Sequence, residues 1–376
     1  MASVSPSIAA PASESASVSI GIIGASGYGG AELLRRLAAH PHCRVSAVGS
    51  RQYLDQSLDA CWPQLAGHYP DLRFSDSDAV IANCEVLLCA APHGAAMDSV
   101  ASAIAQGKRV VDLSADFRIA PDDYAYWYKQ EHRHPELYAQ AVYGLVELHR
   151  EEIIGADLVA NPGCYPSTSA LALAPLAAHH MLGADVVVNA TSGVSGAGRS
   201  AKQALLFSEV NDNYKAYSVA GGHRHIAEIE NSLGRLQAMG RQLRSHEAFE
   251  KVTVSFNPHL APMTRGILAT CYTRPQEARL PDGSPLTHDG LLQLYSDFYQ
   301  GEALVHVQEE LPQTKAVYGS DRCLISVRYD ARSGHIIAFA AIDNLGKGAA
   351  GQAVQNLNLM CGFPESSGLQ LQAVYP

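Results

Sequence analysis

The sequence predicts an α/β protein built from a doubly wound parallel sheet and a second, α+β domain with a mixed sheet. In the first half, short β-branched runs alternate with helical stretches, which is the pattern of βαβ units in a parallel sheet. After Pro162, strand candidates follow one another with few helices between them, which favours antiparallel pairing. A length of 376 residues is enough for two domains that each bury a core.

The elements of the first half follow from apolar runs and turn residues. Val18–Ile23 is expected to be a strand that leads through a Gly-rich turn into an amphipathic helix over Ala31–Ala39. Gly94–Gln106 is expected to be a helix, because it is rich in Ala and is followed by Gly107, a residue that commonly ends helices. The other strand candidates, each too short for a helix, are Val45–Gly49, Val86–Ala90 and Val110–Leu113.

In the second half we expect a helix over Ser167–His180 and a closing helix over Gly346–Met360, whose apolar spacing would let it pack on the first domain. The strand candidates are Ala184–Asn189, Lys251–Phe256, Gly266–Tyr272, Cys323–Tyr329 and His335–Ile342. The expected domains are a first domain over 18–162, completed by 344–376, and a second over 163–343. Residues 1–17, mostly Ser and Ala without Lys or Arg, fit neither a signal nor a transit peptide and are expected to be a disordered leader.

Composition excludes several classes of protein. Apolar residues make up 47% of the chain, which is typical of a globular protein. The formal charge of −10 argues against nucleic-acid or anionic-membrane partners, and no stretch approaches the ~20 apolar residues of a membrane helix. Eight cysteines lie far apart without a Cys-x-x-Cys pair. We therefore expect reduced thiols, no metal site, a cytoplasmic location and a small-molecule substrate.

The Gly-rich run predicts a dinucleotide site of the Rossmann type. It follows a strand and opens a helix, where the backbone must approach a pyrophosphate and the helix N-terminus supplies free N–H groups. The expected contacts are Gly24, Ser26, Gly27, Tyr28 and Gly29. After the second strand the chain has Ser50 and Arg51 in place of an acidic residue, which suits the 2′-phosphate of NADP(H). The alternative is that Arg51 is a solvated loop residue.

Cys164 stands in Asn161-Pro162-Gly163-Cys164, directly before a predicted helix. The helix dipole would lower the pKa of the thiol there, and backbone N–H groups could stabilise an oxyanion on a bound acyl group. A nucleotide site together with a reactive Cys indicates hydride transfer to a thioester, which collapses to an aldehyde.

The run His223-Arg224-His225 has Glu228 three residues beyond its last histidine. If a helix begins near His225, Glu228 lies one turn later on the same face and could orient an acid/base imidazole. The choice of His225 over His223 rests on this spacing, and a capped helix with a surface His is the alternative. Arg118, after a parallel strand, and Arg199, in a loop with Ser195, are candidate anion contacts or structural ion pairs. Arg265 is a weaker candidate of the same kind.

These motifs, in this order, resemble the N-acetyl-γ-glutamyl-phosphate reductases over residues 18–376, together with Asp343-Asn344-Leu-Gly346-Lys347-Gly348. The resemblance implies NADPH-dependent reduction of an acyl phosphate to N-acetylglutamate 5-semialdehyde, with phosphate release, in arginine biosynthesis. It implies that Cys164 is the nucleophile, His225 the acid/base, and His223, Arg118 and Arg199 substrate contacts. It also places Asn344 near the nicotinamide and implies a homo-oligomer, a dimer or tetramer.

Three other functions remain open at this stage. A sister group reduces aminoadipyl or glutamyl phosphate on an acidic carrier protein, but it lacks the Asn-Pro before and the Tyr-Pro after the Gly-Cys pair. Aspartate-semialdehyde dehydrogenases have no counterpart to the His-Arg-His run. A non-catalytic NADP-binding regulator should have lost the nucleophile or the Gly turn, and both are intact.

Overall fold

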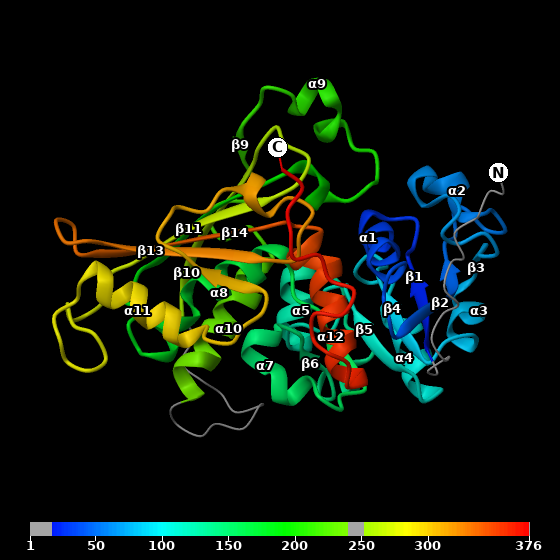
Figure 1. The fold of residues 1–376 in the computed structure, drawn as a ribbon, viewed down its shortest axis with the longest axis horizontal. Coiled ribbons are helices and arrows are strands. Elements are labelled where there is room, and N and C mark those ends of the chain that lie inside the picture. Colours follow the sequence, from blue (N-terminus) through cyan, green and yellow to red (C-terminus); the bar gives the residue numbers. More distant parts are fainter. Residues whose placement is uncertain (1–16, 240–251, 376) are drawn as a thin grey trace, which may run out of the picture.

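Two seven-stranded sheets lie side by side in the computed structural model, which describes residues 17–239 and 252–375 (Figure 1). This arrangement confirms the predicted fold class. Residues 1–16 of the expected leader, and Lys251 of one expected strand, lie outside the described residues.

The first sheet is parallel throughout, with the order β3-β2-β1-β4-β5-β7-β6. Its strands are β1 (Val18–Ile23), β2 (Cys43–Gly49), β3 (Phe74–Ser75), β4 (Val86–Cys89), β5 (Arg109–Asp112), β6 (Val142–Tyr143) and β7 (Leu158–Ala160). The helices of this part are α1 (Tyr28–Leu37), α2 (Leu58–Cys61), α3 (Ser77–Ala82), α4 (Met97–Ala105), α5 (Pro121–Tyr128), α6 (Pro135–Tyr138) and α7 (Val146–Ile153). The strand order reverses direction at β1 and β4, which is where such sheets bind ligands.

The second sheet is mixed, with the order β12-β13-β14-β11-β8-β10-β9. Its strands are β8 (Val186–Ser192), β9 (Lys215–Ala216), β10 (Val254–Leu260), β11 (Ile267–Thr273), β12 (Val305–Val307), β13 (Cys323–Asp330) and β14 (His335–Ile342). Adjacent pairs among β8, β11, β14 and β13 are antiparallel, as expected, whereas β8 pairs with β10 in parallel. Strict burial of alternate residues along β8 and β11 shows that one face of the sheet is the core face.

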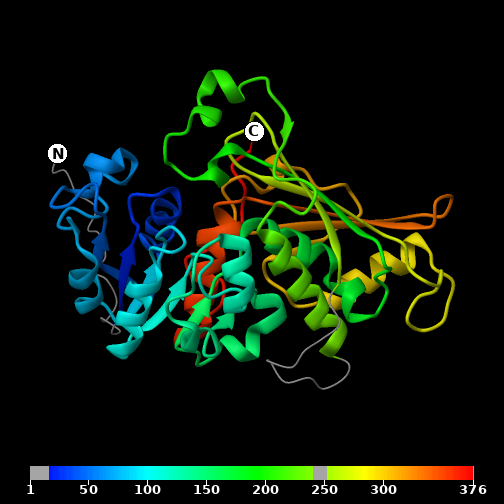
Figure 2. The ribbon, with the colours of Figure 1, turned by 180° about the vertical axis from the view of Figure 1, so that it is seen from behind.

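Three helices supply the core on that face: α8 (Cys164–Ala178), α10 (His225–Met239) and α11 (His288–Phe298). The short α9 (Phe207–Val210) and β9 belong to an arm that projects from the edge of the molecule in both views (Figures 1 and 2). This arm carries exposed apolar side chains, among them Phe207 at 78% exposure.

The closing segment packs against the first sheet. The predicted single helix is instead a π-helix, Gly346–Ala350, followed by α12 (Gly351–Cys361). Ala353, Val354 and Leu357 of α12 are fully buried in the same core as β1 and α1. Both views place α12 in the middle of the molecule (Figures 1 and 2). Expected and observed element ends otherwise differ by a few residues; α1, for example, begins three residues before the expected Ala31.

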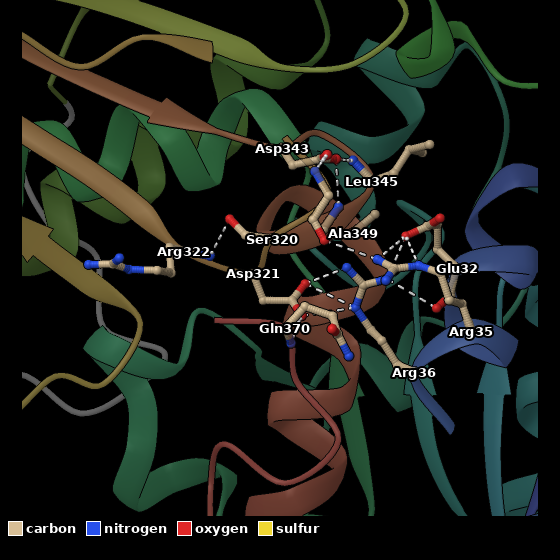
Figure 3. A network of polar contacts seen from close by, with 12 residues as sticks. Glu32, Arg35, Arg36, Ser320, Asp321, Arg322, Asp343, Leu345, Ala349 and Gln370 are labelled. Carbon is tan, nitrogen blue, oxygen red and sulfur yellow. Dashed lines mark hydrogen bonds and ion pairs between the residues drawn. The ribbon is translucent and has the colours of Figure 1, made fainter. Parts of the chain in front are cut away.

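A buried ionic network joins α1 to the second sheet (Figure 3). Arg36 is fully buried and donates to Asp321 from both Nε (2.9 Å to Oδ1) and Nη2 (2.5 Å). Arg265 lies between two carboxylates: its terminal nitrogens donate to both oxygens of Glu32, at 3.0 Å each, and its Nε lies 2.9 Å from Oδ2 of Asp343. With Arg35, which also binds Glu32, the network holds three cations and three anions.

Candidate active site

Cys164 is the first residue of α8, directly after the turn that follows β7. The turn is fixed at Asn161, whose backbone N–H donates to the Asp112 carbonyl at the end of β5. On its other side, the π-helix comes close: a Cβ added to Gly348 would lie 2.9 Å from the Cβ of Cys164. The nucleophile candidate thus lies where the carboxyl edge of the parallel sheet meets α8 and the π-helix.

Glu228 ties three elements together beside this turn. Its side chain is nearly fully buried and accepts from the Gly163 backbone N–H (3.0 Å), the Tyr143 hydroxyl (3.1 Å) and Nη1 of Arg118 (3.2 Å). The predicted direct link to His225 is longer: Nε2 lies 4.0 Å from the carboxylate, beyond hydrogen-bond distance. In this structure Glu228 positions the turn and Arg118 rather than the imidazole itself.

His225 contacts the turn directly. Its Nε2 would be 2.8 Å from a Cβ at Gly163, so the ring packs against the Cα that precedes the cysteine. The rings of His223 and His225 have centroids 4.8 Å apart, and the backbone N–H of His225 donates to Nδ1 of His223 (3.2 Å). Tyr165 and Phe256 line the other sides of His223. The expectation of a helix beginning near His225 is confirmed, and the side chain is largely buried.

Burial dominates the proton equilibria of the site. It raises the pKa of the Cys164 thiol to about 11, against the opposing effects of the Tyr165 backbone N–H and of Arg118. This corrects the expectation of a lowered thiol pKa, because removing the thiolate from water outweighs the helix N-terminus. Burial, together with His223, holds the pKa of His225 well below its usual value, and burial with Arg224 lowers that of His223 to about 4. Both rings are therefore neutral near pH 7, and each has one unprotonated ring nitrogen.

Arg118 lies at the site, and both of its terminal nitrogens already form hydrogen bonds. Its Nη1 binds Glu228 and its Nη2 donates to the Leu113 carbonyl (2.7 Å). Its Nε is buried and has no hydrogen-bond partner among the residues that the structure describes. A substrate contact predicted for Arg118 would use this nitrogen.

Arg199, expected at the substrate, lies over the Gly-rich turn instead. Its Nη1 donates to the Ser26 carbonyl (3.0 Å) and lies 3.0 Å from the sulfur of Cys61. Its guanidinium lies 4.2 Å from the centre of the Trp62 ring. Arg265 likewise belongs to the ionic network. The sequence contains no signal for the positions of Arg199 and Arg265, because the residues that bind these two side chains lie far away along the chain.

Ser195 and Asn344 form a buried pair just beyond the ends of β8 and β14, two strands of the second sheet. Nδ2 of Asn344 donates to the Ser195 hydroxyl (2.9 Å), and its Oδ1 accepts from the Gly266 backbone N–H (2.7 Å). Both side chains are thus held in place at the end of β14. Their predicted roles, substrate contact for Ser195 and nicotinamide contact for Asn344, stay predictions.

The Gly-rich turn has the geometry that a pyrophosphate requires. Gly24 has φ +81°, and a Cβ there would lie 2.5 Å from the Ala90 carbonyl oxygen. Gly27 precedes the first residue of α1, Tyr28, and no side chain caps the helix, so its first N–H groups are free for a ligand. Gly29 is in the first turn of α1. The backbone shape and the free helix N-terminus fit a dinucleotide.

The second strand ends beside this turn. The hydroxyls of Ser50 and Ser26 are 2.8 Å apart, which links β2 to the Gly-rich turn. Arg51 follows and is exposed. This position at the β2 end is the one that the NADP prediction requires of Arg51.

Sequence reasoning missed several residues of the site. Tyr143 binds Glu228, and Tyr217 donates to the hydroxyl of Tyr165 (3.0 Å) beside both histidines. Neither has a sequence signal, because a lone Tyr in a short strand or loop is most often structural. Arg224, the centre of the His-Arg-His run, donates from Nη1 to Nε2 of His93 across the two domains (3.2 Å). Within the described ranges no group of three His, Cys, Asp or Glu residues could hold a metal ion.

Comparison with known proteins agrees with this geometry. Residues 19–156 match the model of the semialdehyde dehydrogenase NAD-binding domain, and residues 164–344 that of the semialdehyde dehydrogenase dimerisation domain. An aspartate semialdehyde dehydrogenase from Candida albicans, solved with NADP, has a TM-score of 0.65 at 17% identity, covering 92% of this chain and 98% of its own. A second one, from Vibrio cholerae, has a TM-score of 0.64, the same identity and the same coverage of both chains. Fold and family models thus define a semialdehyde dehydrogenase-type oxidoreductase.

Closer relatives narrow this class. A protein from Thermus thermophilus named N-acetyl-gamma-glutamyl-phosphate reductase is 50% identical over 95% of this chain and 100% of its own length. One of the same name from Desulforudis audaxviator is 47% identical over 96% of this chain and 100% of its own length. The chain belongs to the N-acetyl-gamma-glutamyl-phosphate reductase family, which confirms the resemblance indicated by the motifs. No helix in the described parts of the chain is both long and apolar enough to cross a membrane.

Proposed function

We propose that this protein reduces N-acetyl-γ-glutamyl phosphate to N-acetylglutamate 5-semialdehyde with NADPH, releasing phosphate, as a step of arginine biosynthesis. The observation that carries the proposal is the convergence of Cys164 and His225 on Gly163, at the carboxyl edge of a sheet with a pyrophosphate-binding turn. Its family membership supplies the substrate.

In the acylation step, the sulfur of Cys164 attacks the acyl carbonyl and phosphate leaves. The thiol is protonated at neutral pH, because burial raises its pKa to about 11. The neutral imidazole of His225 accepts the thiol proton. Since burial disfavours both the thiolate and the imidazolium, proton transfer accompanies C–S bond formation instead of preceding it.

In the reduction step, the thioester on Cys164 is converted to the aldehyde. Ser26, Ser50, Arg51 and the turn from Gly24 to Gly29 would hold the nucleotide, with Arg51 at its 2′-phosphate. NADPH, when bound, supplies the hydride that reduces the thioester carbonyl. Backbone N–H groups at the start of α8 stabilise negative charge on the former carbonyl oxygen. Cys164 departs from the tetrahedral carbon as a thiolate that regains its proton from His225, and the aldehyde is released.

The second domain supports a homo-oligomer, a dimer or tetramer. On the face of the mixed sheet opposite the helices, Val187 pairs with Tyr272 and Tyr272 with Ile337, forming a half-buried apolar row. The family model for this region is a dimerisation domain. A second copy covering this row would bury it.

The test of the function is the reverse reaction, because the acyl phosphate is unstable. Purified protein is mixed with N-acetylglutamate 5-semialdehyde, inorganic phosphate and NADP, and NADPH formation is followed by absorbance. Phosphate-dependent NADPH formation is expected. If no NADPH forms with this free semialdehyde but NADPH forms with carrier-bound aminoadipyl or glutamyl semialdehyde, the proposed substrate is contradicted.

A further inference from the structure

The proposed substrate carries a phosphoryl dianion, and most basic side chains near the site are already committed. Both terminal nitrogens of Arg118 are bound, to Glu228 and to the Leu113 carbonyl. Arg199 lies on the nucleotide turn and Arg265 between Glu32 and Asp343. Arg118 has only its Nε free among the described residues, so a phosphoryl dianion leaving the carbon attached to Cys164 would be better stabilised by a further cation.

The exposed cations Lys202 and Arg224 lie near His93, and of these Arg224 has the planar guanidinium. No carboxylate among the described residues pairs with Arg224. Its contacts are Nε2 of His93, 3.2 Å from Nη1, and the ring of Tyr128, 5.1 Å from its Cζ. Burial and the charge of Arg224 lower the pKa of His93, so that this ring is a neutral acceptor. The remaining N–H groups of the guanidinium have no partner within the described ranges.

The position of Arg224 fits a ligand that enters between the two domains. His93 follows β4, at the carboxyl edge of the parallel sheet, whereas Arg224 immediately precedes the first residue of α10. In the chain, Arg224 stands between His223 and His225, the two rings beside the Cys164 turn. Its guanidinium is exposed beside His93, so the residue adjoins both the turn and the solvent.

We infer that Arg224 is the phosphate-binding residue of this site, receiving the phosphoryl group as it leaves and the inorganic phosphate that attacks the thioester in reverse. The inference rests on the proposed function. Exposure is what favours phosphate over the fixed carboxylate of the substrate, since phosphate must exchange with solvent in each turnover while the acyl chain stays bound to Cys164. The planar guanidinium fork matches phosphate geometry.

The test compares Arg224→Gln and Arg224→Lys with the unaltered protein in the reverse reaction. Arg224→Gln is expected to raise the KM for inorganic phosphate about 10- to 100-fold, and Arg224→Lys, which keeps the charge without the fork, to raise it less. The KM for the semialdehyde and the affinity for NADP should stay within about twofold. Arg44→Gln, at an exposed position on β2 away from the site, is the matched control.

A second readout does not depend on turnover. Inorganic phosphate should raise the melting temperature of the unaltered protein and of Arg44→Gln, and fail to do so for Arg224→Gln. A KM for phosphate that is unchanged in Arg224→Gln would overturn the inference, whether or not the KM for the semialdehyde rises; a rise there would assign Arg224 to the substrate carboxylate. Absence of phosphate-dependent turnover in the unaltered protein would instead refute the proposed function, so the two failures are distinct.

Discussion

The substitution Gly163→Ala, which adds one methyl group, should lower the rate of the reaction without changing the affinity for NADP. The backbone at Gly163 has φ −71° and ψ 153°, which alanine adopts without strain. The added Cβ would lie 2.8 Å from Nε2 of His225 and 3.0 Å from Nη1 of Arg118. Ordinary contact begins near 3.4 Å, so His225 has to retreat by about 0.6 Å.

A displacement of this size moves the proton acceptor away from the thiol. Because about 1 Å of misplacement can cost roughly 100-fold in rate, Gly163→Ala should lower kcat about 10- to 100-fold. Crowding in a buried turn should also lower the free energy of unfolding by about 1–3 kcal/mol. NADP affinity should not change, since the Gly-rich turn is untouched.

Three measurements test this reasoning: kcat in the reverse reaction, NADP affinity by calorimetry, and unfolding in urea. The control is a double-mutant cycle with His225→Asn, whose shorter side chain leaves room for the methyl. In that background, Gly163→Ala should lower kcat little further. The reasoning would be refuted if Gly163→Ala kept kcat within twofold, or if its effect were the same with and without the imidazole.

Further predictions concern the nucleophile, the cofactor, the ionic network and pH. Cys164→Ser should keep NADP affinity and lose nearly all turnover, since an alcohol is the poorer nucleophile; full activity in kinetic assays would remove Cys164 from the mechanism. Arg51→Asp should shift the ratio of kcat/KM for NADP and NAD toward NAD, and an unchanged ratio would contradict its assigned role. Asp321→Asn leaves the buried Arg36 with Glu32 as its remaining anion, so urea unfolding should show a loss of about 3–5 kcal/mol in the free energy of unfolding. Asp289→Asn, at an exposed position of α11 with no ion pair to a described residue, should show almost no loss. The pKa of His223 is about 4 in the folded protein and about 6.5 unfolded, so the unfolded state binds more protons between these values and stability falls as pH falls from 6.5 to 4, by up to about 3 kcal/mol. His223→Gln should show a shallower fall across this window in urea titrations, and equal slopes would count against the shifted pKa.

The sequence predicted best those helix and strand ends that depend on neighbouring residues in the chain. β1 begins and ends where expected because a β-branched run meets a Gly turn at Gly24, whose positive φ excludes other residues. Cys164 could be placed at a helix start for the same local reason. The parallel pairing of β8 with β10 could not, because the strands are joined through the arm and α10, and pairing depends on packing.

Arginine roles were the least predictable part of the site. Arg118, Arg199 and Arg265 each follow a strand or a Gly-rich loop and look alike in sequence. What distinguishes them is a partner far along the chain: Glu228 is 110 residues from Arg118, Ser26 is 173 from Arg199, and Glu32 is 233 from Arg265. Ion-pair partners at such separations have no local sequence signal, so three similar candidates had different outcomes.

The ionic network explains why Arg265 serves the site without touching it. Arg265 immediately precedes Gly266, and Asp343 immediately precedes Asn344. The backbone N–H of Gly266 donates to Oδ1 of Asn344 beside the paired ends of β11 and β14. Both Arg265 and, through it, Asp343 are tied to Glu32 on α1, whose N-terminus presents free N–H groups at the Gly-rich turn. The helix at the Gly-rich turn and the loop that carries Asn344 are therefore linked through ion pairs of Arg265. The nicotinamide contact predicted for Asn344 would depend on this arginine and its two carboxylates.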